Sequence, residues 1–112
     1  MININVTVDE TGLLKSCKVT GHAGAGQRGS DIVCAAVSVL TRTALKVLSG
    51  QEGVFVRGSA PERGCFEMET GYTGSGRTYL DAAGTFLLDG LDWVSREYPD
   101  NCNLIINTER RQ

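Results

Sequence analysis

The sequence has little of several residues and patterns that common functional classes require. It contains one histidine, and no two of its four cysteines, Cys17, Cys34, Cys65 and Cys102, form a Cys-x-x-Cys pair. A metal knuckle and a thioredoxin-like motif are therefore unsupported, and no disulfide framework is expected. The first residues lack the basic start and the continuous apolar run of a signal peptide. These absences favour a cytoplasmic protein, in which thiols stay reduced.

Excess positive charge and long apolar stretches are also missing. The 11 Lys and Arg residues stand against 13 Asp and Glu residues, which gives a net charge of -2 and a pI near 5.3. A protein that binds nucleic acid normally carries a basic face, so we expect no direct nucleic-acid partner. No stretch approaches the ~18 apolar residues that a membrane span needs, so we expect no membrane partner either.

What the sequence does contain is typical of a globular protein. Hydrophobic residues make up 41% and charged residues 21% of the 112 positions, and this balance speaks against disorder. We therefore predict a single domain over residues 1–112. A chain of this size has a small core, and a homodimer would help it to bury more apolar surface.

Apolar and polar residues alternate in several short segments, and apolar residues recur at helical spacing in two longer ones. We predict strands at residues 2–8, 13–20, 54–56, 65–70 and 102–108, and helices from 30 or 31 to 48 and from 77 to 98. The order ββαββαβ predicts an α+β fold, a two-layer α/β arrangement in which both helices pack on one face of a mixed sheet. The first helix is apolar around most of its circumference, so we expect it to lie in the middle of the protein.

Glycine is over-represented, with 14 residues, and it concentrates in two predicted loops, at residues 21–29 and 71–76. The first loop separates His22, at the end of a strand, from Cys34, in the first turn of the first helix. The helix dipole and unpaired N–H groups at that position favour a thiolate, and a neighbouring imidazole would favour it further. Such a pair can attack a carbonyl carbon while the N–H groups hold the oxyanion.

The residues around this pair also allow purely structural interpretations. Asp31 lies one turn before Cys34 and Ser38 one turn after it, so all three can share a helix face. Asp31 fits an N-cap as well as a group that orients His22. Ser38 fits a helix hydroxyl bonded to a preceding carbonyl, and His22 fits a strand-end histidine bonded to the backbone. The remaining cysteines are interpreted as small buried packing residues, namely Cys17, Cys65 and Cys102.

Two other hypotheses use the same part of the chain. Residues 24–29 read Gly-Ala-Gly-Gln-Arg-Gly, a G-x-G-x-x-G pattern that is typical of a nucleotide-binding loop. The preceding strand belongs to a hairpin, and the third glycine comes before the helix, so both features weaken this hypothesis. Zinc held by Cys17, His22, Cys34 and Cys65 would have no recognised ligand spacing. We therefore expect neither a metal nor another cofactor.

The sequence around His22 and Cys34 resembles the signature of a known family. Gly21-His22-Ala23 is followed, six residues later, by Ser-Asp-Ile-Val-Cys-Ala-Ala-Val-Ser at residues 30–38. This pattern is similar to that of the bacterial ribosomal-processing cysteine proteases. Chain length and element order agree with the family as well, so the resemblance extends over essentially the whole sequence.

The resemblance implies a cytoplasmic, homodimeric cysteine protease that removes an N-terminal extension from a large-subunit ribosomal protein. Its peptide substrate, the ribosomal protein precursor, would carry an aromatic residue before the cut. Residue by residue, Cys34 matches the nucleophile and His22 the general base, and Gly21, Asp31 and Ser38 match supporting positions.

Two alternatives to the protease stay open. One is a ribosome-associated interaction protein without catalysis, and the other is a small nucleotide-binding module that uses the glycine loop 24–29. If the chain is a protease, we expect residues 21–30 to close over a bound peptide and the loop 71–76 to line the substrate groove.

Overall fold

The predicted element order ββαββαβ is confirmed. The computed structural model describes residues 1–21, 30–60 and 64–110. In this part of the chain the strands are β1 (Ile2–Asp9), β2 (Leu14–Thr20), β3 (Val54–Ser59), β4 (Phe66–Tyr72) and β5 (Cys102–Glu109), and the helices are α1 (Ser30–Ser49) and α2 (Gly76–Glu97). The α+β class with a mixed sheet is confirmed as well.

The strands form a five-stranded sheet in the order β3-β4-β2-β1-β5. The pairs β1–β2, β2–β4 and β3–β4 are antiparallel. β5 returns to pair in parallel with β1, from Ile2 opposite Cys102 to Asp9 opposite Glu109. The last strand therefore lies beside the first, and the sheet joins the two ends of the chain.

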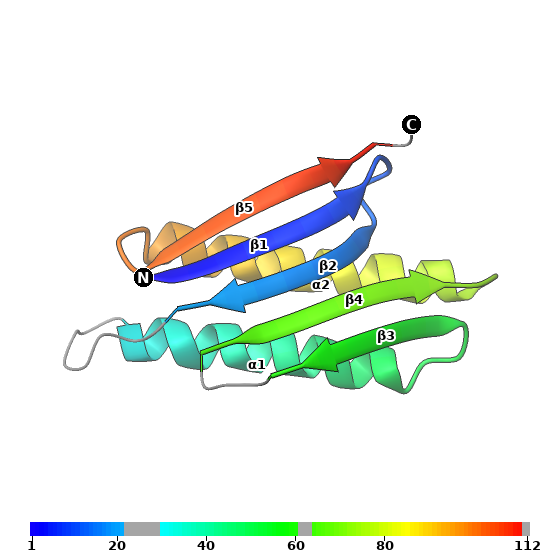
Figure 1. Ribbon diagram of the computed structural model, residues 1–112, viewed down its shortest axis with the longest axis horizontal. Coiled ribbons are helices and arrows are strands. Elements are labelled where there is room, and N and C mark those ends of the chain that lie inside the picture. Colours follow the sequence, from blue (N-terminus) through cyan, green and yellow to red (C-terminus); the bar gives the residue numbers. More distant parts are fainter. Residues whose placement is uncertain (22–29, 61–63, 111–112) are drawn as a thin grey trace.

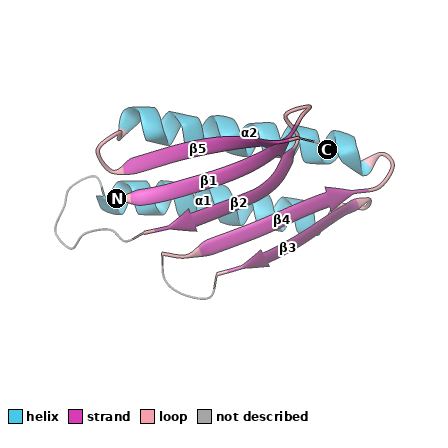
Figure 2. Ribbon diagram, turned by 45° about the horizontal axis from the view of Figure 1, so that its top comes forward, coloured by secondary structure: helices cyan, strands magenta, loops and turns pink. Residues whose placement is uncertain are grey.

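Both helices cover the same face of the sheet, and they run antiparallel to each other (Figures 1 and 2). Apolar and polar residues alternate in β1, so its apolar side chains all point to one face of the sheet. These residues, Ile2, Ile4, Val6 and Val8, are buried beneath the helices, which explains why that face is covered. On the helix side, the core contains residues at helical spacing, among them Val33, Val37, Ala44 and Leu48 of α1 and Leu80, Leu87 and Leu91 of α2.

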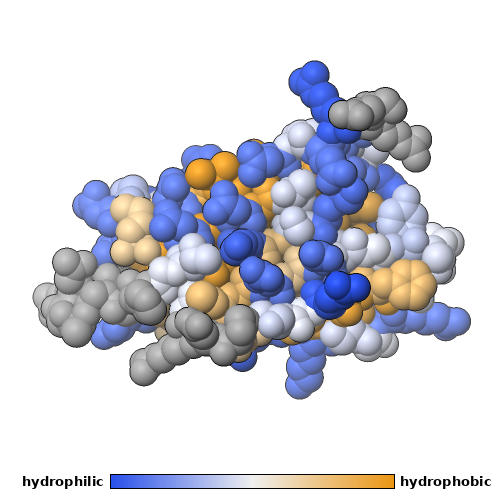
Figure 3. Space-filling model, viewed as in Figure 1, coloured by the Kyte–Doolittle hydropathy of each residue, from blue (hydrophilic) through white to orange (hydrophobic). Residues whose placement is uncertain are grey.

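The other face of the sheet is open and mostly hydrophilic (Figure 3). It carries polar and charged side chains, and the exposed pair Lys18–Glu67 joins β2 to β4 at 3.4 Å. One buried polar residue of α1, Thr41, is satisfied locally because its hydroxyl donates a hydrogen bond to the Val37 carbonyl at 2.8 Å. The molecule therefore has two layers, with its core between sheet and helices.

The prediction that the first helix lies in the middle of the protein is wrong. α1 belongs to an outer layer, and Ile32, Val39 and Val47 are each more than half exposed. The sheet is covered on one side only, so each helix keeps a face that no described element covers. By length and mean hydropathy, 1.6, the segment Asp31–Ser49 would even suffice for a membrane span, contrary to expectation, although core helices of soluble proteins pass the same test.

The second glycine-rich loop is shorter than predicted. β4 continues through Gly71, which is opposite Phe55 in the β3–β4 ladder, as far as Tyr72. α2 then begins at Gly76, so only residues 73–75 connect the two elements. Pairing with the neighbouring strand outweighs the low strand propensity of glycine here.

Candidate active site

Cys34 is the fifth residue of α1 and is partly exposed. The helix already includes Ser30 and Asp31, so Cys34 begins the second turn rather than lying in the predicted first turn. The N–H groups of the first helical turn have no carbonyl partner within the helix, and Cys34 follows that turn directly along the chain. The start of α1 and the end of β2 lie at the same end of the molecule (Figure 1).

The Cys34 side chain borders a small cavity of about 50 Å³, where α1 meets the ends of the sheet strands. The helix contributes further side chains at helical spacing, namely Val37, Ser38, Thr41 and Arg42. The sheet side of the cavity consists of Ile2, Val19, Gly64, Cys65 and Phe66. The thiol is therefore accessible from a cleft with both apolar and polar walls.

Gly21 fixes the path of the chain directly before His22. Its φ is +125°, and a Cβ atom there would collide with the Met1 carbonyl oxygen and lie 3.1 Å from the Ile2 Cα. Only glycine fits between the end of β2 and the start of β1. The next residue in the sequence is His22, which lies outside the described residues.

The structure brings one of the two polar supporting residues to the Cys34 cavity. Ser38 is exposed and lines the cavity next to Cys34. Asp31 is also exposed on α1, but it is not among the residues that line this cavity. Its role as an orienting group for His22 stays a prediction.

The other cysteines divide into two groups. Cys17 and Cys102 are buried, as predicted. Burial raises the pKa of the Cys17 thiol to about 12 and also raises the pKa of Cys102, so neither forms a thiolate readily. The prediction of a buried Cys65 within a strand is wrong, because this residue precedes β4, is partly exposed and faces the same cavity as Cys34.

The sequence analysis did not identify Thr41 and Arg42 as neighbours of the candidate nucleophile, and it grouped Cys65 with Cys34 only in the zinc hypothesis that it discounted. Thr41 and Arg42 lie seven and eight positions after Cys34 and share its helix face, so helical spacing could have identified them. Cys65 could not be found in this way, because β4 and its register bring it to α1 from a distant part of the sequence.

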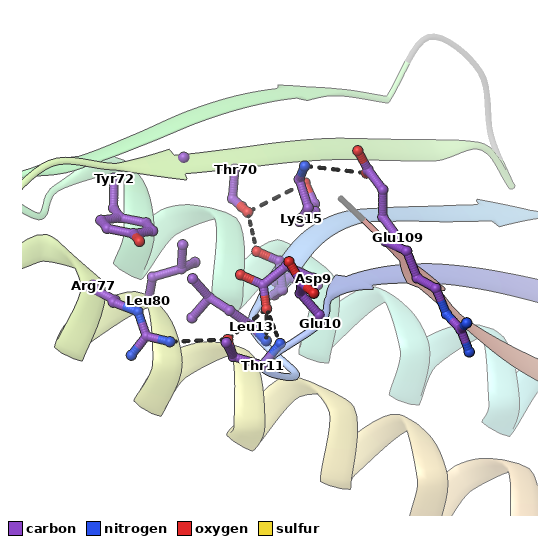
Figure 4. Close-up of a pocket in the computed structure, with 13 residues that line it drawn as sticks. Asp9, Glu10, Thr11, Leu13, Lys15, Thr70, Tyr72, Arg77, Leu80 and Glu109 are labelled. Carbon is purple, nitrogen blue, oxygen red and sulfur yellow. Dashed lines mark hydrogen bonds and ion pairs between the residues drawn. The ribbon is translucent and has the colours of Figure 1, made fainter. Parts of the chain in front are cut away.

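A larger cavity, of about 450 Å³, lies at the opposite end of the sheet (Figure 4). It is lined by the β1–β2 turn, the end of β4 and the start of α2, and it includes Gly71. Gly71 is about 17 Å along β4 from Phe66, at ~3.4 Å per residue. The structure thus separates the second glycine loop from Cys34, contrary to the prediction that it lines the same groove.

Polar groups in this larger cavity bind one another. Lys15 pairs with Glu109 at 3.2 Å, and Arg77 donates a hydrogen bond to the Thr11 hydroxyl at 3.0 Å (Figure 4). The first contact connects the start of β2 to the end of β5, and the second connects the start of α2 to the β1–β2 turn, so the protein's own side chains cross-link the cavity walls.

Three further predictions involve residues outside the described part of the chain. These are the general base His22, the nucleotide-binding pattern at residues 24–29 and the closing loop at residues 21–30, of which only Gly21 and Ser30 belong to the described backbone. Across residues 1–21, 30–60 and 64–110, no group of three or more His, Cys, Asp or Glu side chains is arranged to hold a metal ion.

A partly exposed thiol near the positive end of a helix, facing a cleft, is the kind of site that thiol-dependent enzymes use. The sequence profile of the cysteine protease Prp family matches residues 1–103. The chain therefore belongs to this family of cysteine proteases.

Solved structures of the same fold cover nearly the whole chain. SMU.848 from Streptococcus mutans superposes with a TM-score of 0.79 at 27% identity, covering 97% of this chain and 96% of its own. The essential ribosomal processing protease Prp from S. aureus, in complex with a substrate peptide, gives a TM-score of 0.81 at 22% identity over 96% of this chain and 100% of its own.

The S. aureus protease has also been solved with a covalently linked product peptide. That structure gives a TM-score of 0.78 at 24% identity, and it covers 97% of this chain and 100% of its own. Among curated protein sequences, none matches this chain. The comparisons thus show the fold and the family, while the roles of individual residues rest on the geometry of this chain.

Proposed function

We propose that this cysteine protease removes the N-terminal extension of a large-subunit ribosomal protein, with Cys34 as nucleophile and His22 as general base. The observation that carries the proposal is the placement of Cys34. It combines a position near the start of α1 with access to a cleft, whereas Cys17 and Cys102 are buried. The S. aureus relative of this fold is a ribosomal processing protease that binds a substrate peptide.

The proposed reaction proceeds in two steps. The Cys34 thiolate attacks the scissile carbonyl carbon, N–H groups at the start of α1 stabilise the oxyanion, and His22 protonates the leaving amine. Water, deprotonated by His22, then hydrolyses the thioester and releases the second product. Gly21 fixes the backbone before His22, Ser38 borders the cleft beside the sulfur, and Asp31 orients the imidazole.

The test is cleavage of the candidate precursor by the full-length chain, followed by intact-mass spectrometry. We expect a single cut after an aromatic residue, and no cut after treatment with iodoacetamide. Cys34→Ala and His22→Ala should each lower kcat/KM by at least about a thousandfold while the circular dichroism spectrum stays unchanged, because a dyad acts as a unit.

Cys65→Ala is the matched control, since it removes a second, partly exposed thiol from the same cavity. Full activity of Cys34→Ala together with loss of activity in Cys65→Ala would assign the nucleophile to Cys65. An intact precursor with the wild-type chain would contradict the proposed substrate. If that unreacted precursor still bound tightly, the result would favour a non-catalytic ribosome-associated protein.

The proposal includes three further features, of which the family resemblance implies the first two and the lack of a recognised ligand spacing indicates the third. The protease acts in the cytoplasm, it functions as a homodimer, and it requires no cofactor. Fractionation of cells that express the tagged chain tests its location. Cleavage in the presence of a chelator tests the cofactor requirement, because activity that is lost with chelator and restored by a metal would contradict it.

A further inference from the structure

Cys65 is a thiol that the proposed cleavage reaction does not use. It is partly exposed, whereas Cys17 and Cys102 are buried in the core. In the described part of the chain, the core and the partly buried apolar side chains packed against it do not include Cys65. A free cysteine usually serves as a small buried apolar residue. Core packing therefore does not account for Cys65.

The side chain of Cys65 lines the same cavity as the candidate nucleophile. Cys34 borders this cavity from α1, and Cys65 borders it from the residue that precedes β4. The cavity has a volume of about 50 Å³. At ~10–15 Å³ for each water molecule, this space holds only a few. Two thiols on the walls of so small a cavity are near neighbours, although β3 and most of α1 separate them in the sequence.

The backbone holds the two cysteines differently. Cys34 belongs to α1, whereas Cys65 lies just outside the ladder between β2 and β4, which begins with Phe66 opposite Val19. Gly64 precedes Cys65 with a φ of +85°, a turn conformation that glycine adopts without strain. A disulfide requires Cα atoms roughly 4.4–6.8 Å apart. Cys65, which no strand pairing holds, is the partner that can adjust to this requirement.

We propose that Cys34 and Cys65 form a redox modification site, at which a hydroperoxide converts the two thiols into a reversible disulfide. The Cys34 thiolate attacks one oxygen of the O–O bond and becomes a sulfenic acid, while the alkoxide or hydroxide that leaves takes up a proton. The Cys65 sulfur then attacks the Cys34 sulfur. The S–S bond forms, the S–O bond breaks, and the hydroxyl group leaves as water with the proton of Cys65. Two thiols are thus oxidised by two electrons, and the peroxide is reduced to an alcohol or water.

The disulfide inactivates the protease and also protects its nucleophile. A sulfur bound in a disulfide does not attack a carbonyl carbon, and a thiol reductant releases it. Without a second thiol, further peroxide oxidises the sulfenic acid to sulfinic acid, which thiol reductants do not reverse. Disulfides of cytosolic proteins are usually transient and serve catalysis or redox sensing. Formation of the bond follows from the placement of the two thiols alone, whereas its effect on activity rests on the proposed function, in which Cys34 is the nucleophile.

Peptide mapping of the oxidised full chain tests the pairing. The reduced chain is treated with hydrogen peroxide, alkylated with iodoacetamide in denaturant and digested with trypsin, which cuts after Lys and Arg. Each cysteine then lies in a separate peptide, with Cys34 in residues 29–42 and Cys65 in residues 64–77. We expect these two peptides to be linked, with a summed mass lower by two hydrogen atoms, while Cys17 and Cys102 are alkylated.

The linked species should migrate as a single chain on a non-reducing gel. A disulfide between two chains would contradict the proposed pairing. The inference would also be overturned if both thiols stayed free, or if Cys34 became a sulfinic acid without any link to Cys65.

Activity assays separate this inference from the proposed function. Peroxide should lower cleavage of the precursor by the wild-type chain at least about tenfold, and dithiothreitol should restore it. Cys65→Ala should cleave like the reduced wild-type chain but lose its activity irreversibly in peroxide. Cys102→Ala is the matched control, because it removes a buried thiol and should leave the reversible loss unchanged.

The two ideas fail in different ways. A chain that links the two peptides but never cleaves the precursor would contradict the proposed substrate and leave the modification site standing. A chain that cleaves the precursor without linking the peptides would contradict the modification site alone. Equal recovery of wild-type and Cys65→Ala after dithiothreitol would likewise overturn the role of Cys65.

Discussion

At the scale of single residues, Asp9 shows how one carboxylate organises a turn. Its Oδ1 accepts hydrogen bonds from the Thr11 N–H at 2.8 Å, the Thr11 hydroxyl at 2.6 Å and the Leu13 N–H at 3.0 Å. The hydrogen bond from the Thr11 hydroxyl contributes most to a pKa of Asp9 below its ordinary value of 3.8. Burial is the next largest effect and raises the pKa, while the backbone donors and Arg77 lower it further.

The lowered pKa of Asp9 predicts a pH-dependent part of stability. Because the folded pKa lies below the ordinary 3.8, the stabilisation is present above that pH and is lost as the pH falls through the folded pKa. Asp9→Asn should lower the free energy of unfolding at pH 7 by less than about 1 kcal/mol, since the turn is solvent-screened. Urea denaturation of the wild-type chain and the variant at pH 7 and pH 2.5 checks this prediction. A difference in free energy of unfolding between the two proteins that is as large at pH 2.5 as at pH 7 would contradict it.

The candidate site divides at the residue scale into parts that the sequence could identify and parts that it could not. Cys34 and Ser38 could be predicted because both follow from helical spacing and a local motif. The burial of Cys17 and Cys102, which excludes them as nucleophiles, could be predicted as well from their places in strands. Cys65 lies beside Cys34 because β4 pairs with β2 in a particular register, and no local pattern encodes that pairing.

At the scale of secondary structure, the start of α2 requires a glycine because another part of the backbone packs directly against it. The first helical residue, Gly76, is buried, and a Cβ atom there would collide with the carbonyl group of Gly53. The Thr73 N–H also donates a hydrogen bond to the Gly53 carbonyl oxygen at 2.8 Å. Backbone therefore packs directly on backbone where α2 begins. A glycine-rich composition suggests flexibility, but here the absence of a side chain allows a close contact.

This contact predicts that Gly76→Ala destabilises the protein by about 1–3 kcal/mol, as overpacking of a buried site does. The backbone of Gly53 cannot move aside as a flexible side chain would. Gly71→Ala is the matched control, because nothing lies within 4 Å of its Cβ position and its φ is not positive. Thermal unfolding followed by circular dichroism measures both, and equal midpoints for the two variants would contradict the prediction.

The alternating and helical periodicities predicted every element, because each periodicity reflects a face turned toward the core. The predictions from periodicity were wrong at two points, which are the place of α1 in the fold and the end of β4. α1 is apolar toward the sheet and also on its outer side, so periodicity alone placed it in the middle. β4 extends through Gly71 because of its partner β3, although glycine locally favours a turn.

At the scale of the whole molecule, β5 completes the sheet by pairing with β1 along eight residues. Cys102 at its start is buried, and Leu104 packs against the core. The end of the chain thus covers the edge of the first strand, although the two segments are separated by almost the entire sequence.

Deletion of residues 102–112 should therefore abolish the cooperative unfolding transition. The truncated chain would expose the β1 edge and part of the core, and exposed strand edges promote aggregation. Deletion of residues 110–112, which follow β5, is the control and should leave the unfolding midpoint unchanged. An unaltered midpoint in the longer deletion, measured by calorimetry, would contradict the importance of β5.

The sequence by itself determined the element order, the α+β class and the position of the candidate nucleophile near a helix start, because periodicity and local motifs encode these features directly. Only the tertiary structure decided that Cys65 is accessible, which residues border Cys34, where the second glycine segment lies and which helix faces stay uncovered. Those features depend on strand order, register and the covering of a single sheet face, and all three bring together residues that are distant in the chain.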